Sequence, residues 1–126
     1  MADSERRQKG LEMLKEVYAG DVVSPPAGNV FTDVMLEQVF AEVWSRDVLS
    51  IRDRRLLLLG IIAEKGEPMT FGIQAMAALK RGELQPDELR ELLLMIAQYA
   101  GYPRAAALVG LVEQQIAEFE KGKEKG

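Results

Sequence analysis

The chain has 126 residues, 48% of them hydrophobic and 29% charged, and its 16 basic and 20 acidic side chains give a net charge of −4. This composition predicts a folded chain with one modest core, and nucleic acid is not an expected partner because no basic cluster is dense enough to follow phosphates. The absence of cysteine and histidine excludes disulfides, thiolate nucleophiles, Cys/His zinc sites and imidazole bases.

The sequence contains no run of about 18 uncharged apolar residues, so we expect no membrane-spanning helix. Its N-terminal segment, MADSERRQKG, is charged and lacks the apolar centre of a secretory signal. We therefore expect a cytoplasmic protein. Loops of the GxGxxG or Walker type and the Glu/His pattern of di-iron proteins are also absent, so we expect neither a cofactor nor a metal.

Helical periodicity recurs along the chain and strand signals are nearly absent, which predicts an all-α, single-domain bundle of six helices over residues 1–126. Residues 1–31 supply an N-terminal helix and a loop, and residues 120–126 form a mixed-charge tail that we expect to be frayed. The expected helices cover about 4–18, 32–45, 50 through the run LLLLGIIA, 68–80, 86–100, and 103 to about 119.

The first expected helix places Leu11, Leu14 and Tyr18 on one face, and Gly20 ends it. The following segment, GDVVSPPAGN, is the longest expected loop because its prolines and glycines oppose regular structure. Such a loop either borders a site or simply connects two helices on the surface.

The second expected helix begins at Thr32, which can cap it. Its apolar stripe follows the 3–4 spacing of an α-helix. The stripe consists of Leu36, Val39, Phe40 and Val43.

The third expected helix begins at Ser50, with Asp53 in the place of a capping-box acid, and continues into LLLLGIIA. A helix that is apolar all round must be covered on several sides, by partner helices or by another subunit. The fourth contains Gly72, Ala75 and Ala78, small residues that allow either close helix packing or room for a ligand.

Candidate site residues gather around the end of the second helix. Glu42 flanks the apolar stripe, where a half-buried carboxyl group could act as an acid or base; the alternative is a solvated glutamate. Trp44 is either a flat wall for an unsaturated ring or a core residue. Arg46, Arg54 and their arginine neighbours suit a carboxylate substrate, subunit salt bridges or plain solubility.

Gln74 shares a helical face with small apolar neighbours, so it needs a hydrogen-bond partner if it is buried. That partner is either a ligand carbonyl group or a neighbouring backbone group. Taken alone, the residues indicate an all-α domain that forms an oligomer.

The run AEVWSRDVLSIRDRRLLLLGIIA, followed by MAALKRGELQPDELRELLLMIAQYAGYPRAA, resembles the carboxymuconolactone decarboxylase family over about residues 32–112. The resemblance implies an alkylhydroperoxidase-like fold that assembles as a trimer or hexamer. It also implies an activity like that of the family's decarboxylases, which act on a carboxylated muconolactone in aromatic-acid degradation. Relatives with a CxxC pair and a histidine are thiol peroxidases, and the absence of cysteine excludes that branch.

The resemblance also implies roles for single residues. Motif positions of the family are matched by Glu42, Trp44, Arg46, Arg54 and Tyr99. The family's histidine falls at Gln74, whose carboxamide donates and accepts hydrogen bonds but does not exchange a proton near neutral pH.

These observations predict a decarboxylase that acts on a small unsaturated or lactone carboxylic acid. In this mechanism Gln74 would stabilise the oxyanion formed when CO₂ leaves. Glu42, held neutral by burial, would protonate the carbon, and an arginine would orient the carboxylate. Trp44 and Tyr99 would line the pocket. The alternative is a family member that binds small molecules or assembles without catalysis. A third possibility is a purely structural oligomer.

Overall fold

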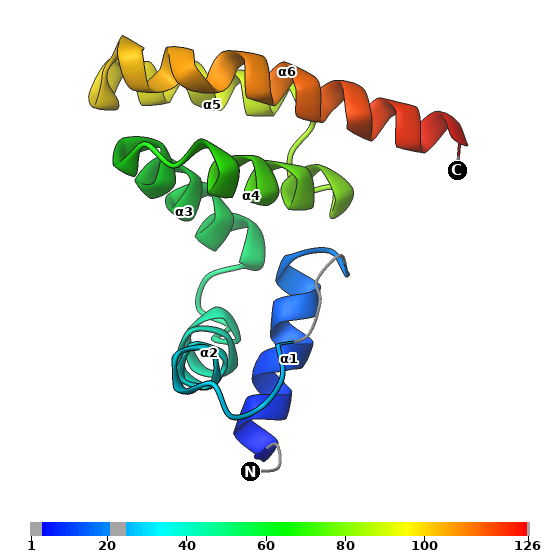
Figure 1. Ribbon diagram of the computed structural model, residues 1–126. Coiled ribbons are helices and arrows are strands. Elements are labelled where there is room, and N and C mark those ends of the chain that lie inside the picture. Colours follow the sequence, from blue (N-terminus) through cyan, green and yellow to red (C-terminus); the bar gives the residue numbers. More distant parts are fainter. Residues whose placement is uncertain (1–3, 21–24, 126) are drawn as a thin grey trace. The chain divides into compact units, whose positions relative to one another are not determined.

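The structure is a computed structural model that describes residues 4–20 and 25–125, and every regular element among these residues is a helix (Figure 1). The α2 and η1 segments form one continuous helix, so the described residues contain six helices, the number predicted. The elements are α1 (Glu5–Val17), α2 (Val30–Val34), the π-helix η1 (Met35–Trp44), α3 (Ile51–Lys65), α4 (Pro68–Lys80), α5 (Pro86–Ala100) and α6 (Tyr102–Lys125).

The chain forms two compact units, one ending at Arg54 and the other beginning at Arg55. Each unit is described by itself below, and the single domain over 1–126 stays a prediction. Within the part of the chain that the structure describes, no helix combines the length and apolar character needed to cross a bilayer. The described residues also contain no acidic cluster able to hold a metal ion.

The first unit is built on the packing of α1 along η1. The Ser4 side chain caps α1 by accepting a hydrogen bond from the Arg7 backbone N–H (3.0 Å), and the buried face carries Leu11 and Leu14. At Gly10 the η1 backbone approaches so closely that a Cβ atom would lie 2.1 Å from the Leu36 carbonyl oxygen. Only glycine fits this crossing.

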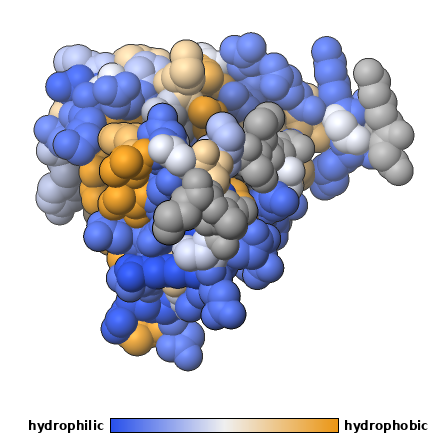
Figure 2. Space-filling view, turned by 60° about the horizontal axis from the view of Figure 1, so that its bottom comes forward, coloured by the Kyte–Doolittle hydropathy of each residue, from blue (hydrophilic) through white to orange (hydrophobic). Residues whose placement is uncertain are grey.

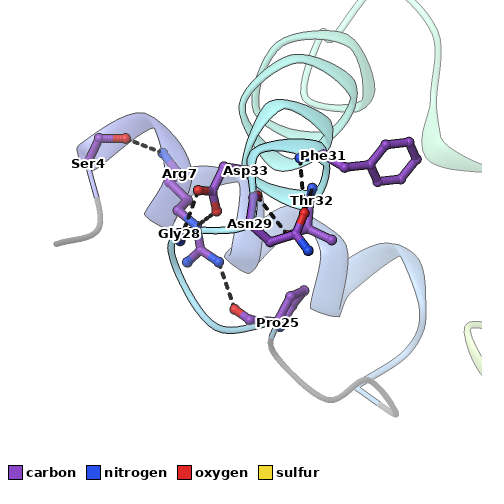
Figure 3. Close-up of polar contacts among 8 residues, drawn as sticks. All are labelled: Ser4, Arg7, Pro25, Gly28, Asn29, Phe31, Thr32 and Asp33. Atoms are coloured by element: carbon purple, nitrogen blue, oxygen red, sulfur yellow. Dashed lines mark hydrogen bonds and ion pairs between the residues drawn. The ribbon is translucent and has the colours of Figure 1, made fainter. Parts of the chain in front are cut away.

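The second helix begins two residues before the predicted start, because Asn29 rather than Thr32 caps it. The Asn29 Oδ1 atom accepts hydrogen bonds from the backbone N–H groups of Phe31 (3.0 Å) and Thr32 (3.3 Å), as Figure 3 shows. The Thr32 hydroxyl donates back to the Asn29 carbonyl (3.1 Å). The predicted Thr32 cap is therefore wrong.

The apolar stripe predicted on this helix is only half correct. Leu36 and Phe40 are buried, but Val39 and Val43 are 42% and 50% exposed. The reason is the π-helical geometry of η1, whose i→i+5 hydrogen bonds make each turn wider than in the α-helix that the prediction assumed. The inward face therefore also takes Ala41 and Trp44.

The second unit contains α3 from Arg55 on and all of α4, α5 and α6, and its core joins side chains of these four helices. The predicted bounds of α4 and α5 are confirmed. Gly72 on α4 lies against α6, since an added Cβ atom would be 3.2 Å from Leu111 and Gln115. The small residues of α4 therefore serve helix packing. α6 continues to Lys125, beyond the predicted end near residue 119, and Gly126 lies outside the described residues.

The apolar α3 is not covered on all sides by its own unit. Leu59 and Ile62 are buried, whereas Leu57 and Ile61 are 63% and 45% exposed. Hydrophobic side chains also reach the surface in patches on the face shown in Figure 2, among mostly hydrophilic neighbours.

Candidate functional site

A hollow of about 600 Å³ in the first unit contains two of the predicted site residues, Glu42 and Arg46. Its polar lining is completed by Lys9 from α1 and by Ser45 and Asp47 after the end of η1. Two cationic and two anionic side chains thus face one solvent-open space. Such a set can bind a small acid through its cations and retains carboxylates for proton handling.

Local hydrogen bonds at the end of η1 explain why Arg46 joins Glu42. The Ser45 hydroxyl donates to the Ala41 carbonyl (2.5 Å), and the Arg46 backbone N–H donates to the Val43 carbonyl (3.2 Å). These bonds close the last turn, so the chain leaves the helix beside Glu42. The Arg54 guanidinium then donates from Nη2 to the Arg46 carbonyl (3.2 Å), while its buried Nε has no hydrogen-bond partner. Arg54 therefore supports the backbone at Arg46.

Of the two alternatives considered for Glu42, a half-buried acid and a solvated glutamate, the structure shows the second. Its side chain is 57% exposed and forms an ion pair with Arg6 of α1. Arg6 also donates from Nε to the Glu37 carbonyl (3.0 Å), which fixes its guanidinium against η1. The burial that its proposed catalytic role required is not found, because the wider turn of the π-helix places Ala41 inward and leaves Glu42 at the solvent side. Glu42 is a solvated carboxylate.

Trp44 belongs to the core of the first unit. Trp44 is 9% exposed, and its ring stacks on Phe40 with ring centroids 6.4 Å apart and an angle of 9° between the ring planes. Trp44 does not line the hollow beside Glu42. Of the two alternatives considered for Trp44, a pocket wall and a core residue, the structure therefore shows the core residue.

Gln74 is 2% exposed and lies in a buried ionic network of the second unit. The Arg55 Nη1 atom donates to Gln74 Oε1 (2.5 Å), and Arg55 Nε donates to Glu83 Oε1 (3.0 Å). Arg81 Nε donates to the other oxygen of Glu83 (2.6 Å). The Arg55 and Glu83 side chains are 0% and 7% exposed, so an ion pair is buried here. Because the Gln74 oxygen accepts from Arg55, the NH₂ group of its carboxamide points away from that contact.

Tyr99 on α5 is 85% exposed and does not line the hollow beside Glu42. The structure thus brings Glu42 and Arg46 together in one hollow, with Arg54 behind Arg46. Gln74 and Tyr99 belong to the second unit, one buried and one on its surface.

Several functional side chains were missed from the sequence. Lys9 and Arg6 carried no signal because the first helix was considered only for its apolar face. Arg55 and Glu83 lie 28 residues apart, and no local spacing connects them. The sequence shows Arg55 near the start of an apolar helix, but it gives no signal that Glu83 is its buried partner.

A second missed pair supports the first unit. Arg7 is 3% exposed; its Nε donates to Asp33 Oδ1 (2.7 Å) and its Nη2 donates to the Pro25 carbonyl (2.7 Å). Asp33 Oδ2 accepts from the Gly28 N–H (3.0 Å), as drawn in Figure 3. The hydrogen bond from Arg7 holds the pKa of Asp33 below its usual value. Residues 21–24 of the predicted loop lie outside the described residues, and from Pro25 on it is tied to α1.

Together these features define a protein whose described residues are helical in every regular element and in which two carboxylates and two cations share an open hollow. Residues 31–114, two thirds of the chain, match the sequence model of the carboxymuconolactone decarboxylase family, and the chain belongs to this family. It is 28% identical over 131 residues to a 4-carboxymuconolactone decarboxylase of Acinetobacter baylyi, covering 99% of this chain and 97% of that protein. It is 27% identical over 124 residues to the nitrosuccinic acid decarboxylase npaB of Metarhizium robertsii, covering 93% and 86%.

Proposed function

We propose that the chain is a decarboxylase that acts on a small carboxylic acid, with an unsaturated or lactone acid as the preferred substrate class. Both relatives described above are named decarboxylases, and each is matched over most of its length. The observation that carries the proposal in this chain is the hollow in which Glu42 lies beside Arg46 and Lys9.

The chemistry follows from these charges. Arg46 binds the substrate carboxylate through its planar guanidinium. When the bond to CO₂ breaks, its electron pair remains on the substrate carbon and is delocalised into an adjacent carbonyl group. A cation close to that oxygen lowers the barrier. A proton then replaces CO₂ on the carbon.

The structure changes the role that we assign to Glu42. Glu42 is exposed to solvent and paired with Arg6, so the burial on which its expected role as proton donor depended is absent. We propose instead that the ammonium group of Lys9, which lines the same hollow, donates the proton. Glu42 then orients that ammonium group.

Purified protein supplied with γ-carboxymuconolactone, and separately with nitrosuccinate, tests the proposal by CO₂ release. We expect turnover of at least one acid, with about 100-fold lower kcat in Lys9→Met and a marked loss in Glu42→Gln. Glu12→Gln, an exposed substitution on the same helix as Lys9, serves as the control and should retain full activity. Absence of turnover in the unmodified chain refutes the proposal.

A second candidate is a family member that binds a small acid without catalysis. The specific observation in its favour is Gln74, which stands where the family has a histidine and whose oxygen is engaged by Arg55. A thermal-shift screen of lactone and aromatic acids, followed by turnover assays on each hit, separates the candidates. Binding without turnover, with CO₂ release gained in Gln74→His, favours the second.

We also propose self-association as a trimer or hexamer. Support comes from Leu57 and Ile61, which leave part of the apolar α3 exposed in the isolated chain. Analytical ultracentrifugation at micromolar concentration tests this, and a stable monomer contradicts it.

A further inference from the structure

A second hollow, of about 690 Å³, lies between α5 and α6 of the second unit and is larger than the one beside Glu42. Its floor is formed by Leu93, Ala97 and Ala105, which are 8%, 5% and 4% exposed. Its sides are formed by Leu94 and Val109, which are 57% and 49% exposed. We call this space the α5–α6 groove. Its volume and apolar floor fall within the range of small-molecule sites in proteins.

The groove has two chemically different ends. At one end Arg90 joins the helices, with Nε and Nη2 donating to the two oxygens of Glu113 (2.8 and 2.9 Å) and Nη1 donating to Asp87 (2.8 Å). At the other end lies Tyr102, whose hydroxyl oxygen accepts from Gln98 (3.1 Å). From residue 90 to residue 97 the helix rises about 10 Å, so the groove accommodates an elongated molecule.

The charged rim of the groove is predominantly acidic. It carries the carboxylates of Asp87, Glu91 and Glu113 against the single guanidinium of Arg90. The hydrogen bonds between Arg90 and Glu113 raise the pKa of Arg90 and lower the pKa of Glu113, so both are ionised at neutral pH. Asp87 and Glu113 together exceed the charge of Arg90 by one, and Glu91 adds a further carboxylate. The rim therefore retains an excess of two negative charges.

We propose that the α5–α6 groove binds an organic cation with an apolar body. The body covers the floor made by Leu93, Ala97 and Ala105, and the cationic group lies at the rim near Glu91. Electrostatic complementarity selects this occupant, since an anion or a nucleic acid meets the same excess negative charge. The ligand is opposite in charge to the substrate of the proposed decarboxylase, so either proposal can fail without the other.

Three probes with one skeleton test the charge preference: 4-phenylbutylamine, 4-phenylbutanol and 4-phenylbutyrate, titrated into the full chain by calorimetry at low salt. We expect the amine to bind at least tenfold more tightly than the butyrate, with the alcohol between them, and the preference to shrink at high salt. Equal affinities for the amine and the butyrate overturn the proposal.

Variants place the binding in the groove. Ala106→Trp fills the groove from an exposed position on α6 and should reduce the affinity for the amine at least tenfold. Ala107→Trp, exposed on the same helix but outside the groove, is the matched control and should bind normally. Glu91→Lys should reduce the affinity for the amine and raise that for the butyrate.

Two outcomes overturn the proposal. The first is amine binding that persists in Ala106→Trp. The second is an unmodified chain that does not bind the amine but self-associates, with the self-association lost in Ala106→Trp; this result identifies a second copy as the occupant of the groove.

Discussion

Replacing Glu83 by glutamine removes the carboxylate that balances a fully buried guanidinium. Arg55 is 0% exposed, and its Nε and Nη2 atoms donate to the two oxygens of Glu83 at 3.0 and 3.5 Å. Breaking a buried ion pair by removing one partner leaves an uncompensated charge and costs about 3–5 kcal/mol. That is a large share of the roughly 5–15 kcal/mol by which domains are stable.

Urea unfolding followed by circular dichroism measures this cost. With a denaturant slope of about 2 kcal/mol/M, the midpoint of Glu83→Gln should fall by roughly 2 M. Glu113→Gln removes a carboxylate from an ion pair with Arg90 whose side chains are about half exposed, so its shift should be far smaller.

A double replacement provides the sharper test. Arg55→Met combined with Glu83→Leu removes both charges and should lose less stability than Glu83→Gln alone, since apolar replacement of a buried pair is often neutral. Equal midpoint shifts in Glu83→Gln and Glu113→Gln would refute the reasoning, because burial would then have no effect on the cost.

Two further predictions concern the first unit and its contacts. Gly10→Ala should destabilise the chain by about 1–3 kcal/mol or more, because the added methyl group meets the η1 backbone. The control Gly110→Ala on α6 adds a methyl group with no atom within 4 Å, so in thermal unfolding it should be neutral or stabilising by about 0.5–1 kcal/mol. Arg7 lowers the folded-state pKa of Asp33, so the ionised Asp33 stabilises the folded state. This contribution to the free energy of unfolding is complete above the usual aspartate pKa of about 3.9 and is lost as the pH falls through the folded-state pKa. The stability difference between the unmodified chain and Asp33→Asn should therefore be large at pH 6 and shrink towards pH 3 in urea unfolding, with Glu12→Gln as a control that shows no such trend. A Gly10→Ala chain as stable as Gly110→Ala, or a pH-independent effect of Asp33→Asn, contradicts the respective prediction.

The parts of the fold that the sequence predicted well are those defined by local signals. The start of α5 is a clear case: Pro86 occupies the first turn, and Gln85 and Glu88 form a reciprocal cap. Its end at Gly101, which has a positive φ of 100°, is likewise local. Such elements need no knowledge of tertiary contacts.

The site was harder to predict because its residues depend on non-local geometry. The prediction for Glu42 assumed the α-helical period. In the π-helix that side chain lies at the solvent side, and Trp44 lies in the core. The environment of Gln74 depends on Arg55, 19 residues before it, which no spacing rule connects to it. Family resemblance suggested candidate positions, but only the fold gave their surroundings.

The most direct test of the decarboxylase proposal is ¹³C NMR of γ-carboxymuconolactone labelled at its carboxyl carbon, recorded with the unmodified chain and with Lys9→Met. We predict that the label appears as CO₂ and bicarbonate with the unmodified chain and about 100-fold more slowly with Lys9→Met. Label that stays in the acid with the unmodified chain, both here and in the same experiment with carboxyl-labelled nitrosuccinate, or equal release from the unmodified chain and Lys9→Met, would contradict the proposal.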